Sequence, residues 1–84
     1  MTKLHDDPYT VAVAKAMAAA PVPVREIARR AGVSNAYLAR MALGERRCTA
    51  RVGAGVAKAL ESIAAEAAAA VRILARASKP RGKP

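Results

Sequence analysis

The residues of this chain best suited to bind another molecule are arginines, and they gather in the middle of the sequence. The formal net charge is +9, yet residues 1–23 are neutral, with two lysines against two aspartates. Guanidinium groups form forked hydrogen bonds with phosphate and guanine, so such a cluster is typical of a surface that binds a polyanion. The alternative is a solvated surface that keeps the protein in solution. Between residues 24 and 58 only Glu26 and Glu45 oppose the basic side chains, which are Arg25, Arg29, Arg30, Arg40, Arg46, Arg47, Arg51 and Lys58.

The sequence offers no arrangement of residues for catalysis or for a metal. His5 is the single histidine and stands beside Asp6 and Asp7. A weak metal site there is less favoured than helix-capping and solvated roles. The glutamates are scattered, and no glycine-rich loop follows a predicted strand. We therefore expect a protein that is not an enzyme and that has no cofactor and no metal.

Two short helices between residues 24 and 43 must position the central arginines. Apolar residues fall on one stripe of a helix that ends at Gly32 and on one stripe of a second helix. Gly32 can adopt the positive φ that a sharp turn requires. Ser34 can cap the second helix, which we expect over residues 35–43. Ala28 is small enough to let the two helices cross closely. The apolar residues predicted to form this part of the core are Ile27, Ala28, Ala31, Val33, Leu38 and Met41.

This pair of helices resembles the helix-turn-helix of the lambda-repressor and Cro-like DNA-binding family. The resemblance consists of the paired stripes, the small Ala28, the turn Gly32-Val33-Ser34 and Gly44 after the second helix. It continues into GERRCTARVGAGVAKAL, which is similar to the family's next loop and fourth helix. The chain departs from the family at Val24 and Leu43, where polar residues are common. The resemblance implies an all-α fold of four or five short helices with a long C-terminal helix. An ordinary helical hairpin is the alternative.

By position in the motif, the resemblance also implies which residues contact double-stranded DNA. Asn35 can bond adenine in a bidentate way, and Arg40 can fork onto guanine. The full expected set of base-contacting residues is Ser34, Asn35, Ala36, Ala39 and Arg40. Phosphate contacts fix the register without reading sequence. The expected phosphate-contacting residues are Arg25, Arg29, Tyr37, Arg46, Arg47 and Arg51. For Tyr37 the alternative is a half-buried packing role.

A helix is predicted before this motif. Asp7 can cap it and Pro8 suits its first position, so we expect it from Pro8 to about Ala20. Pro21-Val22-Pro23 ends it, and Pro23 can then open the next helix. The expected inward stripe of this first helix is Val11, Ala14 and Met17 or Ala18.

A further helix is predicted after the motif, capped by Thr49. Gly53 and Gly55 lie inside it and each lowers its stability by about 1 kcal/mol relative to Ala. A close contact with a neighbouring helix would explain both. From Leu60 no helix breaker follows, so this helix either runs on or kinks into a fifth helix near Ser62.

The segment from Leu60 onward has apolar residues at alternating spacings of three and four, as in a coiled coil. We interpret them as a dimer seam, because a chain without Phe or Trp has a thin core and because family members often pair through this end. Packing against the chain's own first helix is the alternative. The residues of the predicted seam are Leu60, Ile63, Ala67, Ala70, Val71 and Leu74.

We expect one domain in this chain of 84 residues. A loose lead over 1–7 precedes a helical domain over 8–77, whose last part, about 60–77, is the dimerisation helix, and a basic disordered tail covers 78–84. Cys48 is the only cysteine and can form no internal disulfide, which suits a reducing cytoplasm. We find no signal peptide and no apolar run of membrane-spanning length. These features predict a cytoplasmic, nucleoid-associated protein.

The resemblance and the charge together predict a sequence-specific, double-stranded DNA-binding transcriptional regulator. We expect a repressor encoded by a bacterium, phage or plasmid, acting as a homodimer on a two-fold site. One alternative is an antitoxin-type autoregulator whose C-terminal helix binds a protein partner. Another is an architectural binder that uses charge alone. A lac-repressor-type headpiece shares AGVS, but its motif lies at the very N-terminus, whereas a helix precedes the motif here.

Overall fold

The computed structural model describes residues 4–77 and consists of helices and short connections over that range. The helices are α1 (Pro8–Ala19), α2 (Val24–Ala31), α3 (Asn35–Ala42) and α4 (Ala50–Ala77). The all-α prediction with a long C-terminal helix is confirmed, and α4 runs to Ala77 without a separate fifth helix. Within the described range no helix is both long enough and apolar enough to cross a membrane.

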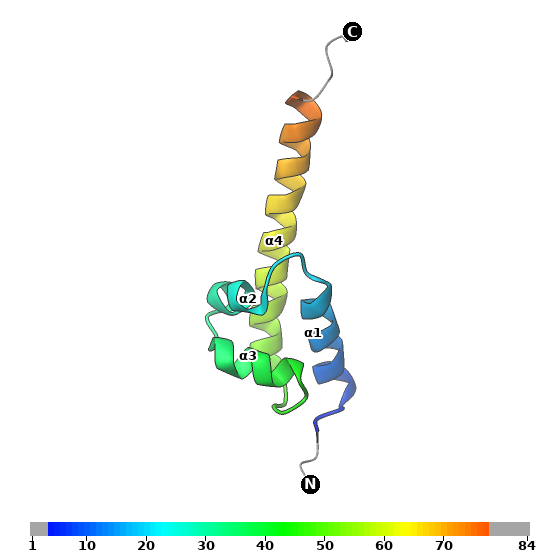
Figure 1. Cartoon of the computed structure of the whole chain (residues 1–84), viewed down its shortest axis with the longest axis vertical. Coiled ribbons are helices and arrows are strands. Elements are labelled where there is room, and N and C mark those ends of the chain that lie inside the picture. Colours follow the sequence, from blue (N-terminus) through cyan, green and yellow to red (C-terminus); the bar gives the residue numbers. More distant parts are fainter. Residues whose placement is uncertain (1–3, 78–84) are drawn as a thin grey trace.

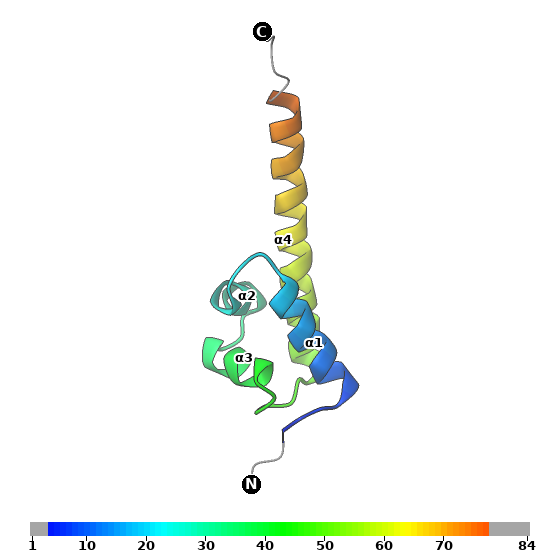
Figure 2. The ribbon, with the colours of Figure 1, turned by 45° about the vertical axis from the view of Figure 1, so that its right-hand side comes forward.

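The first three helices surround the N-terminal half of α4, and the C-terminal half of α4 extends beyond them as a free rod (Figure 1). The view turned by 45° shows the same arrangement (Figure 2). At 1.5 Å per residue the 28 residues of α4 span about 42 Å. α4 packs most closely on α2, and α3 packs on α1 and α2. α3 therefore lies at the end of the molecule opposite the free end of α4.

Side-chain caps begin three of the helices, as the sequence predicts. Each cap accepts the backbone N–H of the residue three positions later: Asp7 at α1 (3.0 Å), Ser34 at α3 (3.2 Å) and Thr49 at α4 (3.2 Å). Pro23 opens α2 as predicted, as its N-cap. Its extended backbone directs its carbonyl at the first free N–H groups of the helix, those of Glu26 and Ile27.

Glycines with positive φ end α2 and α3. Gly32 has φ of 70° and Gly44 has φ of 84°. The residue after each glycine donates its N–H to a carbonyl five residues earlier, at 3.0 and 2.8 Å, which satisfies the last turn of the helix. α1 and α3 end at Ala19 and Ala42, one residue before the expected ends.

The core is aliphatic and lies where α1, α2 and α3 meet α4. Ile27, Leu38 and Met41 are fully buried, as predicted, and Ala28 is buried beside them. Ala31 and Val33, also predicted for the core, are partly buried. The other buried residues of this core are Met17, Cys48, Val56, Ala59 and Ile63.

The buried face of α1 differs from the predicted one. Met17 is buried, but Ala18 is exposed and the other two expected residues are only half-buried. Thr10 faces the core instead, and it is only 1% exposed. Its hydroxyl accepts the Cys48 N–H at 2.9 Å and donates to an oxygen of Asp7 at 2.9 Å. Both polar roles of the hydroxyl are thus satisfied, which is what allows a threonine to be buried there. The half-buried pair is Val11 and Ala14.

Residues 4–7, part of the lead expected over 1–7, contact the end of α3. The His5 N–H donates to the Gly44 carbonyl at 2.7 Å. Leu4 lies beside Gly44 as well, since a Cβ added there would be 3.4 Å from the Leu4 Cβ. Met1 to Lys3 and the tail predicted at 78–84 lie outside the described residues.

Two residues of the predicted dimer seam belong at least partly to this chain's own core. Ile63 is 6% exposed, and Leu60 is half-buried against the same core. The expectation that Ile63 lies in a seam between chains is therefore wrong, because its face of α4 is the one that packs on the other helices. The remaining predicted seam residues are exposed: Ala67, Ala70, Val71 and Leu74.

α4 approaches its neighbours closely at two glycines, which confirms the reason expected for them. A Cβ on Gly53 would lie 1.8 Å from the Tyr9 hydroxyl oxygen. A Cβ on Gly55 would lie 3.2 Å from the Ala31 carbonyl oxygen. A tyrosine side chain can swing aside, whereas the backbone of α2 is fixed by its own hydrogen bonds. Gly55 is therefore the stricter requirement.

We expect Gly55→Leu to lower the free energy of unfolding by about 1–3 kcal/mol, because the side chain must push α2 away from α4. This loss is expected despite the higher helix propensity of leucine. Ala54→Leu is the matched control, since Ala54 is exposed on the same turn of α4. Urea unfolding followed by circular dichroism measures both. Equal stability of the two variants would show that α2 and α4 do not need this close approach.

Candidate nucleic-acid interface

The turn between α2 and α3 presents one face of α3 to solvent. Leu38 and Met41 hold the opposite face of α3 in the core. The left-handed Gly32 and the cap Ser34 occupy the turn, so α3 begins at once after α2 ends. This arrangement has the two packed helices and the tight turn that the sequence predicted.

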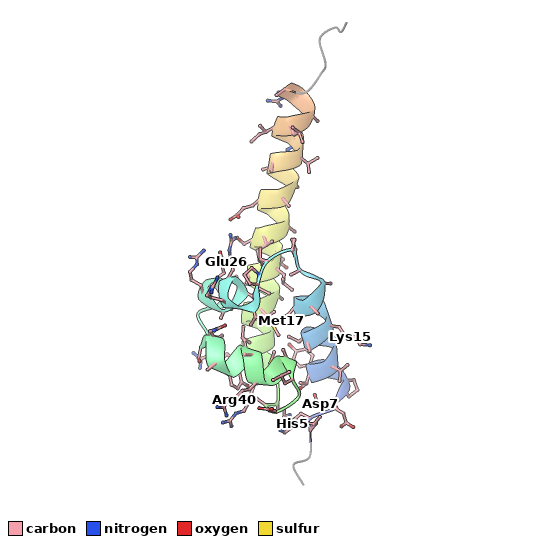
Figure 3. All side chains as sticks on the ribbon, in the orientation of Figure 1. His5, Asp7, Lys15, Met17, Glu26 and Arg40 are labelled. Atoms are coloured by element: carbon pink, nitrogen blue, oxygen red, sulfur yellow. The ribbon has the colours of Figure 1, made fainter. Side chains whose placement is uncertain are left out.

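All five predicted base-contacting residues are exposed. Ala36, Ala39 and Arg40 lie on the face of α3 that points away from its buried stripe. Asn35 is the first residue of α3. Arg40 projects from α3 away from the helical body (Figure 3). Because two of the five residues are alanines, another molecule can approach the helix backbone closely between the polar side chains.

The guanidinium of Arg40 is bound to no carboxylate of the residues that the structure describes. Over residues 4–77 every ion pair includes Arg29 or Arg30. Leu43 is 66% exposed and extends the same face at the end of α3. The face thus combines an amide, a free guanidinium and small or apolar side chains, which can form hydrogen bonds and apolar contacts with base edges.

The predicted phosphate-contacting residues occupy three different settings. Arg51 lines a hollow together with the Gly32–Ser34 turn, so it lies next to the N-terminal end of α3. Arg25 and Arg46 are exposed at the start of α2 and in the loop after α3. The remaining residues of the set are Arg29, Tyr37 and Arg47.

Arg47 lies near acidic groups on the α1 side. It lines a hollow that also includes Asp6 and Asp7. The pKa of Asp7 is lowered, mainly by the backbone N–H of Thr10 and to a smaller degree by the positive charge of Arg47. These acidic neighbours make Arg47 a weaker phosphate candidate than Arg51.

Tyr37 performs the packing role that the sequence left open as an alternative. Its ring is half-buried against the core. Its hydroxyl donates to the Arg47 carbonyl at 2.5 Å, which uses the only proton that the hydroxyl can donate. In this arrangement Tyr37 anchors the loop after α3 and has no donor left for a phosphate.

Arg29 and Arg30 share the carboxylate of Glu26 within α2. Arg29 Nε donates to Glu26 at 3.1 Å, and the Arg29 side chain remains 69% exposed at the edge of the surface. Arg30 is only 19% exposed and donates to Glu26 at 2.7 Å and to Glu66 on α4 at 2.7 and 2.8 Å. It also donates to the Ser62 hydroxyl at 3.0 Å. Arg30 therefore fastens α2 to α4, a role that sequence reasoning missed.

These pairs change the ionisation of the carboxylates. Hydrogen bonds from Arg29 and then Arg30 lower the pKa of Glu26 from 4.5 to about 2. A hydrogen bond from Arg30 also lowers the pKa of Glu66. Because the folded state holds these groups charged, their contribution to stability is complete above pH 4.5 and is lost as the pH falls toward 2.

The described residues contain no group of three or more histidine, cysteine, aspartate or glutamate side chains that could hold a metal. Cys48 is buried, and burial raises the pKa of its thiol. A buried thiol with a raised pKa is a structural residue rather than a reactive one.

Comparison with known proteins adds no further assignment. No protein-family model, no curated protein and no solved structure matches this chain. Membership of the lambda-repressor and Cro-like family therefore stays a prediction from the motif residues.

Glu26→Gln should destabilise the protein at pH 7, and the difference from the wild type should shrink as the pH falls from 4.5 to 2. The reason is that Glu26 must be charged to hold both arginines. Thermal unfolding followed by circular dichroism across this pH range measures the effect. Glu45→Gln is the control, because Glu45 is exposed and forms no ion pair in the described residues. A constant difference at all pH values would contradict the assignment to Glu26.

Proposed function

We propose that this protein is a sequence-specific double-stranded DNA-binding regulator that places α3 in the major groove. It acts as a homodimer and represses transcription by occupying a promoter. The exposed face of α3 is the observation on which this proposal rests: Asn35 and the unpaired Arg40 flank Ala36 and Ala39 on a helix held by a tight turn. An α-helix fills the major groove, where the four base pairs differ in their hydrogen-bonding groups.

The charge around this face supports contacts to the DNA backbone. Arg51 lies beside the turn that precedes α3, and Arg25 and Arg46 are exposed. Arginines on either side of the inserted helix fix its register through the phosphates. Arg29 adds to this set only if it exchanges Glu26 for a phosphate. Arg30 contributes nothing, because it holds α2 to α4.

Selection from a random duplex pool tests this function directly. The affinity for the selected site and for scrambled DNA is then measured over a salt series. We expect the selected site to bind at least ~10³-fold more tightly than scrambled DNA. If no site is enriched and binding falls steeply with salt, charge alone binds DNA and the architectural alternative is correct. If no duplex binds, the exposed apolar end of α4 points to the alternative of a protein partner, as in antitoxins.

Arg40→Ala and Arg51→Ala should have different consequences for DNA binding. Loss of Arg40 should remove about 1–3 kcal/mol of discrimination at one base pair. Loss of Arg51 should weaken binding to all sequences alike and lower the salt slope by about 1. Arg76→Ala is the matched control, because it removes the same charge from the far end of α4. Affinities for single-base variants of the selected site measure all three. Equal behaviour of Arg40→Ala and Arg51→Ala would contradict this division of roles.

A further inference from the structure

One uncharged stripe of α4 remains uncovered along most of the helix. Its residues, called the free stripe here, are Ala57, Leu60, Ala64, Ala67, Val71 and Leu74. They follow one another at alternating spacings of three and four, the repeat of a coiled coil. Val71 and Leu74 are 64% and 65% exposed, and Leu60 is only half-buried. Leu60 also packs on the edge of this chain's own core, whereas the other residues of the free stripe are exposed.

The lower part of the free stripe forms one wall of a groove. α1 supplies the other wall through Ala12, Val13 and Ala16, and the residues of α4 that line the groove are Gly53, Val56, Ala57 and Leu60. Only apolar side chains and glycine line this groove. α4 packs less extensively on α1 than on α2. A groove of this composition fits an apolar helix and offers no hydrogen bond to a polar ligand.

We infer that a second copy of this chain fills the groove, and that the two α4 helices pair antiparallel with Val71 and Leu74 of each copy in the groove of the other. The free stripe is complementary to itself in this one register. Ala57 then faces Leu74, Leu60 faces Val71 and Ala64 faces Ala67 of the second copy. The outermost layers thus place the large Leu74 against the small Ala57, at the level of the groove.

A parallel pair fits the same residues less well. It would stack Leu60 on Leu60 and Leu74 on Leu74, with Ala64 on Ala64 between them. It would also leave both grooves empty, because Val71 and Leu74 of each copy would lie beyond the groove of the other. A parallel pair that uses only the free end of α4, residues 67–77, has a contact about 16 Å long. The antiparallel register overlaps residues 54–77 of both copies over about 36 Å.

Charge favours the antiparallel register as well. Glu61 lies beside the free stripe, and Arg72 lies on the same side of α4. In the antiparallel register Glu61 of one copy lies about 3 Å along the axis from the level of Arg72 of the other. The pair occurs twice by symmetry. A parallel pair would instead gather Arg72 and Arg76 of both copies at one end.

This pairing separates the two DNA-binding faces. α3 lies at the N-terminal end of α4, and Arg40 projects away from the free end (Figure 3). In the antiparallel dimer the two α4 helices begin about 46 Å apart, at opposite ends. This consequence rests on the proposed function: the dimer would hold two DNA segments together rather than both halves of one short site.

Leu74→Glu tests the pairing of the two free stripes, because it places a charge in the groove of the second copy. We expect the wild type to sediment as a dimer and Leu74→Glu to raise the dimer dissociation constant at least ten-fold. Ile73→Glu is the matched control, since Ile73 is 69% exposed but lies on another face of α4. Helix content by circular dichroism shows that both variants fold. A monomeric wild type, or equal dissociation of the two variants, would overturn the inference.

A spin label on Arg76→Cys tests the direction of pairing, because Arg76 lies outside the free stripe. The two labels are about 30 Å apart or more in the antiparallel dimer, and about 20 Å apart in a parallel dimer. The unsubstituted chain is labelled in parallel to show that the buried Cys48 takes up no label. A short distance would overturn the antiparallel register.

Capture of a free duplex by a bead-bound duplex tests the consequence for DNA. We expect capture by the wild type and by Ile73→Glu, and its loss in Leu74→Glu. A Leu74→Glu monomer that still binds one duplex supports both proposals. Dimers that bind no DNA refute the proposed function alone. Monomers of the wild type that bind DNA refute the inference alone.

Discussion

The close crossing of α4 over α2 is the contact on which the rest of the structure depends. At Gly55 the backbone of α4 comes so near α2 that an added Cβ would lie 3.2 Å from the Ala31 carbonyl oxygen. A chain without Phe or Trp has no large ring to fill a wide gap between helices. It reaches close packing by bringing backbones together, so that Ile27 and Val56 can fill the space between them. Glycine and alanine at the crossing are therefore requirements of this core.

Polar contacts at the edge of this core then fix the orientation of each helix. Arg30 ties α2 to Glu66 on α4, and buried Thr10 ties the start of α1 to the backbone of Cys48 before α4. Tyr37 ties α3 to the loop that follows it. α3 itself packs on α1 and α2. The direction of its exposed face is thus set by contacts that lie outside that face, which leaves the face free to bind another molecule.

The sequence alone predicted the features that depend on near neighbours. The caps Asp7, Ser34 and Thr49 and the turn at Gly32 act within a few residues, and all were predicted correctly. Contacts between distant residues were missed. The pairing of Arg30 with Glu66 joins residues 36 positions apart, and nothing in the local pattern of either indicates the other. Ile63 shows the same limit, because the spacing that marks an apolar stripe does not identify the helix that covers it.

Net charge also overstates the surface available to DNA. The guanidinium of Arg30 binds Glu66 on α4. Arg29 and Arg30 share Glu26, and Arg47 lies near Asp7. The arginines without such acidic neighbours include Arg40 and Arg51, and these lie on or beside α3. The far end of α4 carries exposed apolar groups of its own, at Val71, Ile73 and Leu74. A helix about 42 Å long extends away from α3, so that self-association along α4 need not cover the face of α3 that we propose contacts bases.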